Sequence, residues 1–143
     1  MPITKINPDT LPDAGALGYT QTVTSPPGEL IFCSGQVAID RDGTPVPEDL
    51  GEQAKVAANN VKLALAAAGA TPDDVTAVRL YIVGLTPERL GAVGSALPAL
   101  FNGTAPCATA IGVEALADPE YQVEIEVMAV KSYEVGCAGG CGA

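Results

Sequence analysis

The stretch Val123-Glu124-Ile125-Glu126-Val127-Met128-Ala129 alternates between two sets of side chains. A period of two places successive side chains on opposite faces of a β-strand, so the stretch predicts a long final strand over Tyr121 to Lys131. One set is wholly apolar and should face a core: Val123, Ile125, Val127 and Ala129. The other set mixes carboxylates with large apolar groups: Glu124, Glu126, Met128 and Val130.

Further strands are predicted upstream of this one. Val75 to Val83 alternates in the same way, and its second set of side chains consists of Arg79, Tyr81 and Val83. Ala108 to Glu114 also reads as a strand. Tyr19 to Thr24 and Leu30 to Ala38 are rich in β-formers, and the turn residues between them predict a hairpin.

Two helices are predicted between these strands. Asp49 followed by Glu52 resembles a capping box, and apolar residues at helical spacing follow it as far as Gly69, a C-terminal cap. Thr86 before Pro87 starts a second helix, which should run towards Phe101. Pro98 should kink this second helix or end its first part.

The predicted order ββαβαββ is an α+β sheet with two helices on one face. Its other face carries Tyr81, Val83, Met128 and Val130, which a monomer would leave in water. We therefore expect that face to pack against other copies of the chain. The alternative is that Gly- and Pro-rich connections of the same chain cover it.

Composition bounds the size and location of the protein. The chain has 143 residues, with 48% hydrophobic and 17% charged residues, which fits one globular domain. We place this domain at residues 1–131 and a flexible Gly- and Cys-rich tail at residues 132–143. The N-terminus lacks the pattern of a signal peptide, and no apolar run is long enough to span a bilayer. These features predict a soluble, cytoplasmic protein without membrane contact.

Charge and residue content exclude several kinds of chemistry. A formal charge of −10 disfavours nucleic-acid binding, and with it a ribonuclease role. The absence of histidine removes Ser-His-Asp and Cys-His nucleophiles and His-ligated metals. Cys33 and Cys107 are interpreted as packed thiols. Cys137 and Cys141 lie in the tail, where a metal clip or a disulfide is the alternative to free thiols. No metal or cofactor site is predicted.

Glu124 is the most informative single residue of the pattern. A carboxyl group on a partly buried face is suited to proton transfer. The alternative is a glutamate at the rim of the sheet, exposed to water.

Four segments together resemble the reactive intermediate deaminase (RidA, YjgF) family. They are Gly18-Tyr19-Thr20-Gln21, Phe32-Cys33-Ser34-Gly35-Gln36, the helix from Gln53 to Gly69, and Val123 to Ala129. The resemblance implies a chorismate-mutase-like fold and a homotrimeric barrel with a small-molecule site at each subunit interface. It also implies cofactor-free hydrolysis of 2-aminoacrylate and related enamines or imines to 2-oxo acids and ammonia.

The resemblance also implies roles for individual residues. Tyr19 and Ser34 match residues that line the pocket, and Gly35 matches a backbone donor to the ligand. Glu124 matches the glutamate that orients the attacking water. Each has a structural alternative: a core aromatic for Tyr19, a strand hydroxyl for Ser34, and a bulge or close backbone approach for Gly35.

Several positions depart from the family pattern. Ala108 stands where active members carry the arginine that clamps the substrate carboxylate, Gly94 where asparagine is common, and Ala110 where many members have a cysteine. Arg79 could supply a replacement cation, or it could form an ordinary ion pair.

These departures leave three hypotheses. The protein is a deaminase with a replacement cation, a deaminase whose substrate lacks a carboxylate, or a trimer that binds small molecules or proteins without catalysis. Cys107, next to the altered position, is a pocket thiol or, because no histidine can activate it, a packed one.

Overall fold

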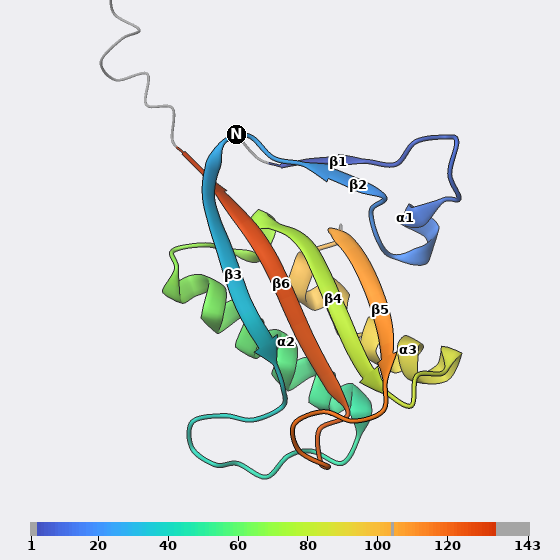
Figure 1. The fold of residues 1–143 in the computed structure, drawn as a ribbon, viewed down its shortest axis with the longest axis vertical. Coiled ribbons are helices and arrows are strands. Elements are labelled where there is room, and N and C mark those ends of the chain that lie inside the picture. The colour runs from blue at the N-terminus through green and yellow to red at the C-terminus, as the bar shows by residue number, and fades with distance from the viewer. Residues whose placement is uncertain (1–2, 104, 134–143) are drawn as a thin grey trace, which may run out of the picture.

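The structure is a computed structural model that describes residues 3–103 and 105–133 (Figure 1). Its main sheet has four strands in the order β3-β6-β4-β5. Their bounds are Gly28–Gln36 for β3, Val123–Ser132 for β6, Val75–Val83 for β4 and Cys107–Val113 for β5. β6 is antiparallel to both of its neighbours, whereas β4 and β5 are parallel. The last strand in the sequence is therefore a central strand of the sheet.

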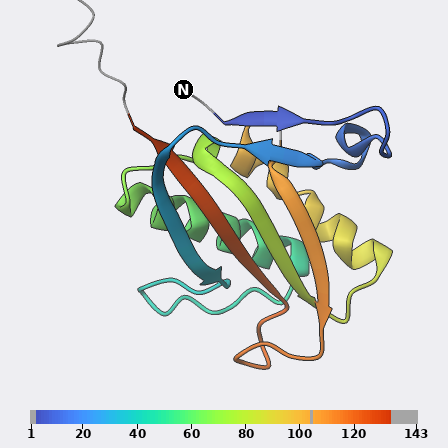
Figure 2. The same cartoon turned by 45° about the horizontal axis from the view of Figure 1, so that its top comes forward.

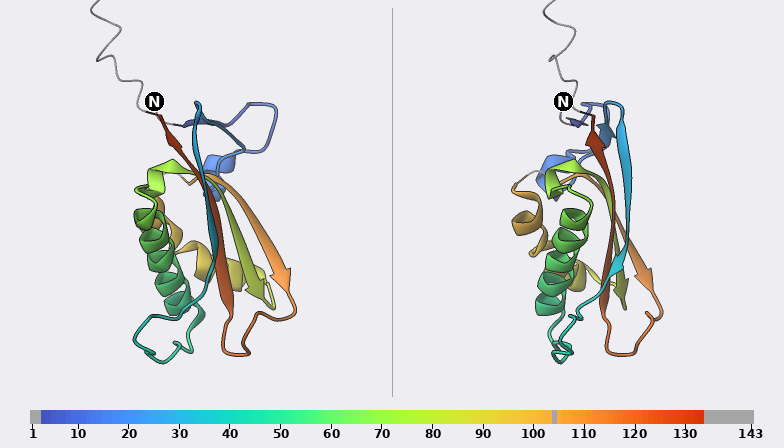
Figure 3. Two further views of the ribbon diagram at one scale, coloured as in Figure 1. Left: turned by 60° about the vertical axis from the view of Figure 1, so that its left-hand side comes forward. Right: turned by 90° about the vertical axis from the view of Figure 1, so that its left-hand side faces the viewer.

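Three helices lie on one face of this sheet, and the other face is open (Figure 3). α2 spans Leu50–Ala67, and the Asp49 carboxylate accepts a hydrogen bond of 2.9 Å from the backbone N–H of Glu52, as the capping pattern predicts. α3 spans Pro87–Gly94 and α4 spans Leu97–Phe101. A short 3-10 turn, Pro72–Asp74, precedes β4.

The second predicted helix is two helices. α3 ends at Gly94 and α4 begins at Leu97, so that Pro98 falls in the first turn of α4. Between them Ser95 still donates to the carbonyl of Gly91 and Ala96 to that of Val93. In one continuous helix, Pro98 would remove a hydrogen bond and clash with the preceding turn, whereas the first turn of a helix needs no donor there. The break thus comes before the proline rather than at it.

The predicted hairpin is wrong. β2 (Thr22–Thr24) pairs with β1 (Thr4–Ile6) in a small separate sheet, and β3 pairs with β6. Figure 2 shows this small sheet across one end of the main sheet, and the short α1 (Ala14–Leu17) belongs to the same N-terminal region. Consecutive prolines fix φ and favour extended backbone, so Pro26-Pro27 carries the chain from one sheet to the other instead of reversing it. The predicted ββαβαββ order holds from β2 to β6, with β1 and α1 added before it and the second helix divided into α3 and α4.

The core lies between the main sheet and the helices. Val123, Ile125 and Ile82 from the sheet are fully buried. α2 meets them through small side chains, with Ala54 and Ala57 also fully buried, which lets the helix approach the sheet closely. The apolar set of the final strand therefore faces the core as predicted.

The polar side chain of Gln53 is buried, and both its nitrogen and its oxygen form hydrogen bonds. Its Nε2 donates to the carbonyl oxygens of Pro47 at 2.7 Å and Glu120 at 2.8 Å, and its Oε1 accepts from the backbone N–H of Gln122 at 2.9 Å. It ties the connections before α2 and β6 together at one end of the sheet.

At the C-terminus, β6 continues to Ser132, one residue into the predicted tail. Cys137 and Cys141 lie outside the described residues. Within the part of the chain that is described, no helix is long and apolar enough to cross a membrane. The same residues contain no group of three or more histidine, cysteine or acidic side chains arranged to hold a metal ion.

Candidate functional site

Glu124 and Gly35 meet on the open face of the main sheet. A register shift between Cys33 and Gln36 forms a bulge in β3 opposite this part of β6. A Cβ placed on Gly35 would overlap the Glu124 carboxyl group, so that group lies directly over the glycine backbone. Glu124 is half-buried, and Ser34 beside it is exposed. The bulge and the close backbone approach, which were the structural alternative for Gly35, are therefore both present.

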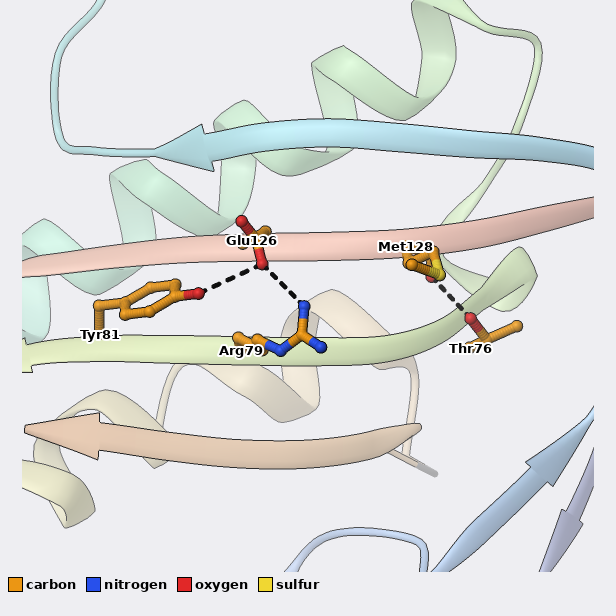
Figure 4. Close-up of polar contacts among 5 residues, drawn as sticks. All are labelled: Thr76, Arg79, Tyr81, Glu126 and Met128. Atoms are coloured by element: carbon orange, nitrogen blue, oxygen red, sulfur yellow. Dashed lines mark hydrogen bonds and ion pairs between the residues drawn. The ribbon is translucent and has the colours of Figure 1, made fainter.

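Arg79 lies on the same face but is engaged elsewhere (Figure 4). Its guanidinium forms an ion pair with Glu126 at 3.1 Å, and the Tyr81 hydroxyl donates to the same carboxylate at 3.3 Å. Loss of hydration at the half-buried phenol, and then the Glu126 charge, raise the pKa of Tyr81 above its usual value. Of the two interpretations of Arg79, the geometry favours the ion pair.

Large apolar side chains also lie on the open face. Phe32 is 69% exposed and Leu30 is 59% exposed, both on the edge strand β3. Tyr81, Val83 and Met128 are half-buried rather than left in water. Val130 is buried within the chain itself, so the expectation that it is exposed is wrong.

A cavity of about 630 Å³ lies on the other side of the sheet, beside the edge strand β5. Ala108 and Ala110 line it from β5, Gly94 from α3, and Tyr19 from the segment after α1. Leu90, Leu97 and Phe101 are among the side chains that complete its walls. None of the described lining residues carries a charge.

Tyr19 is the aromatic lining residue contributed by the N-terminal region. Its oxygen accepts a hydrogen bond of 3.4 Å from Gln21 Nε2, which also donates to the carbonyl of Pro12 at 3.1 Å. A phenol that accepts one hydrogen bond keeps its own hydrogen for an acceptor. Of the two interpretations of Tyr19, its position in the cavity wall favours the pocket residue.

The two thiols of the described region are packed. Burial raises the pKa of the Cys33 thiol above its usual value, which disfavours the reactive thiolate. Cys107 Sγ contacts the carbonyl oxygen of Gln21 at 3.7 Å, and Cys107 is not among the cavity residues.

The expected site residues form two groups on opposite faces of the sheet. Ala108 and Ala110 pair in register with the core residues Val78 and Leu80, so they point to the helix-covered side. Glu124 pairs with Tyr81 on the open side. One chain therefore cannot place Glu124 and the β5 alanines around the same small molecule.

Sequence reasoning missed the apolar walls of the cavity. Leu80, Leu97 and Phe101 follow a core pattern, and nothing in their spacing distinguishes a cavity wall from a filled core.

Known proteins resemble this chain over most of its length. Residues 12–131 match the model of the family described as Endoribonuclease L-PSP. The RutC family protein YjgH of Escherichia coli K12 is 35% identical over 109 residues, which cover 75% of this chain and 79% of the relative. The 2-iminobutanoate/2-iminopropanoate deaminase of the same strain is 29% identical over 107 residues, covering 73% and 81%.

A solved structure is similar as well. YyfB from Yersinia pestis, a Rid family protein described as being of unknown function, superposes with a TM-score of 0.86 at 36% identity. The superposition covers 92% of this chain and 100% of that one. The mixed α+β architecture is thus the architecture of Rid structures.

Proposed function

The chain belongs to the Endoribonuclease L-PSP family, also known as the YjgF/RidA family, and on this premise we propose that it hydrolyses an imine or enamine to a carbonyl compound and ammonia. Relatives named as deaminases support this reaction class. The observation that carries the proposal is the Glu124 carboxyl group, held over the backbone of Gly35 on a face that the chain leaves open.

The site is completed between copies of the chain. Glu124, Ser34 and Gly35 lie on the open face, whereas Ala108, Ala110 and Tyr19 line a cavity on the other side at the sheet edge. A chorismate-mutase-like homotrimer would bring the open face of one copy against the cavity edge of the next. The exposed Phe32 and Leu30 on β3 supply apolar surface for such a contact.

The reaction needs a positioned water and one group that moves protons. The Glu124 carboxylate accepts a proton from water as the water oxygen bonds to the imine carbon, and the C=N electron pair moves to nitrogen. Glu124 gives this proton to the nitrogen, which completes the neutral carbinolamine. Glu124 then accepts the proton of the carbinolamine hydroxyl as the C=O bond forms and delivers it to the leaving nitrogen, so that ammonia departs and the carboxylate is restored. An enamine first takes a proton on carbon to become the imine. The balance is one imine and one water to one carbonyl and one ammonia, with no cofactor.

The preferred substrate differs from 2-aminoacrylate. Ala108 has only a methyl group where active family members have the carboxylate-binding arginine, and no described lining residue of the cavity is charged. Arg79 is less suited to replace that arginine, because its guanidinium is already engaged in the ion pair with Glu126 at 3.1 Å. Loss of a charged hydrogen bond to a carboxylate costs about 1.5–3 kcal/mol of affinity.

The test is ammonia release from freshly generated imines, with and without a carboxylate, by wild type, Glu124→Gln and Glu126→Gln. Both variants remove one charge from the same face of β6, but only Glu124 lies over Gly35. We expect Glu124→Gln to lower turnover about 10²–10⁴-fold and Glu126→Gln to stay within a few-fold of wild type. Equal turnover by wild type and Glu124→Gln would overturn the proposal.

A trimer that binds a small molecule or a protein without catalysis is the second candidate. The replacements at Ala108, Ala110 and Gly94 favour it, because they remove polar groups from the cavity while keeping its walls. Ligand binding that leaves every imine unhydrolysed is the result this candidate predicts.

A further inference from the structure

We propose that the cavity beside β5 receives an uncharged substrate through a bulky apolar substituent on the imine carbon, an arylmethyl or branched alkyl group. This inference rests on the proposed function for the chemistry at that carbon. It adds the substrate class, which comes from the walls of the cavity.

The polarity of the walls excludes a charged group. Among the described lining residues, only Tyr19 and Ser95 have polar side chains. The Ser95 hydroxyl already donates to the carbonyl of Gly91 at 2.8 Å. A carboxylate in the cavity would lose its hydration, and among the described lining side chains only Tyr19 carries a hydroxyl whose hydrogen is not already donated. An apolar group loses no hydrogen bond there and gains contacts with Leu90, Leu97 and Phe101.

The volume of the cavity favours a substrate with a bulky substituent. Its volume of about 630 Å³ lies within the usual range of about 300–1,000 Å³ for pockets that bind drug-sized ligands. A three-carbon imino acid would leave most of it to water, in contact with apolar walls. The chain also leaves this space unfilled where it could fill it, because a Cβ added to Gly91 or Gly94 meets no neighbouring described atom within 4 Å.

Four ketones, the stable products of such a reaction, test separately whether the cavity prefers a bulky apolar group and whether it rejects a carboxylate. Phenylacetone and phenylpyruvate share an aryl group, acetone and pyruvate lack it, and each pair differs by one carboxylate. Calorimetric titration of the full-length protein should give the tightest binding for phenylacetone. We expect it to bind at least about tenfold more tightly than either acetone or phenylpyruvate.

Gly94→Leu supplies the structural control. The leucine side chain of this variant enters the open space from α3, and the backbone at position 94 does not require glycine. We expect a tenfold or greater loss of phenylacetone affinity with an unchanged thermal midpoint. Ala66→Leu adds the same side chain to an exposed position of α2 and should leave the affinity unchanged.

The outcomes separate this inference from the proposed function. Tightest binding of phenylacetone that Gly94→Leu abolishes supports the substrate class, even if no imine is hydrolysed. Equal binding of phenylacetone and acetone, tighter binding of phenylpyruvate than of phenylacetone, or an unchanged affinity in Gly94→Leu overturns it, even if ammonia release is observed.

Discussion

The two faces of the main sheet follow the same alternating pattern but have different partners. On the covered face, Val123 and Ile125 are fully buried against the helices of their own chain. On the open face, Phe32 is 69% exposed, while Glu124 and Glu126 are half-buried. Alternation thus assigns a side chain to a face, but it does not say what covers that face.

The largest expected effect is a loss of stability when a side chain of the covered face is removed. Ile125→Ala removes a fully buried side chain from the central strand and leaves a cavity, so we expect a loss of about 2–5 kcal/mol in the free energy of unfolding. Urea denaturation measures this loss. Leu63→Ala, at a position 62% exposed on α2, should change stability by no more than about 0.5 kcal/mol. Similar losses in both variants would mean that the covered face is not the stabilising core.

A smaller effect, on the association of copies, is expected when Phe32 on the open face is replaced. Wild type should have the mass of three 14.4 kDa chains, and Phe32→Asp should weaken association at least about tenfold, because a charge replaces apolar surface in the contact. Sedimentation over a range of concentrations measures both, and the circular dichroism of the variant should match wild type. Leu63→Asp is the matched control on α2. A wild-type mass of one chain contradicts the proposed assembly.

The smallest effect concerns Tyr81, whose raised pKa reports the surroundings of the open face. Because the folded state holds the phenolic proton more tightly than the unfolded state, the associated stability is present below the ordinary tyrosine pKa of about 10. It is lost as the pH rises through the folded value. Glu126→Gln should lower the Tyr81 pKa, and Arg79→Gln should raise it further. Alkaline absorbance titration, with Tyr81→Phe as the reference, measures both shifts, and shifts of the same sign would contradict this account.

Local signals in the sequence predicted much of the fold. The bounds of β4, the Asp49 cap of α2 and the core set of β6 follow from short-range periodicity and capping, and the structure confirms them. The hairpin was wrong, because it depended on competition between alternatives that differ only in tertiary contacts, whereas the interruption expected at Pro98 is present as the division between α3 and α4. β2 meets β1 instead of β3, and α4 starts anew ahead of Pro98.

The candidate site was predictable residue by residue but not as an arrangement. Glu124, Gly35, Ala108 and Ala110 were identified from the family pattern, and the structure adds that they occupy two faces. Alternation separates two sets of side chains within each strand, but which set of β5 shares a face with Glu124 depends on the pairing of distant strands, such as Ala108 with Val78. A single sequence does not specify that pairing, so the separation of the two groups could not be anticipated.

The central position of β6 also determines when this chain can fold. β3 hydrogen-bonds only to β6 in the described sheet, and its first pair joins Gly28 to Ser132. During synthesis β3 therefore leaves the ribosome before its partner, and its edge stays unpaired and Ile31 and Cys33 stay unburied until β6 has also been made. The sheet is therefore completed only once β6 is available, and until then the unpaired edge of β3 is open to pairing with other chains.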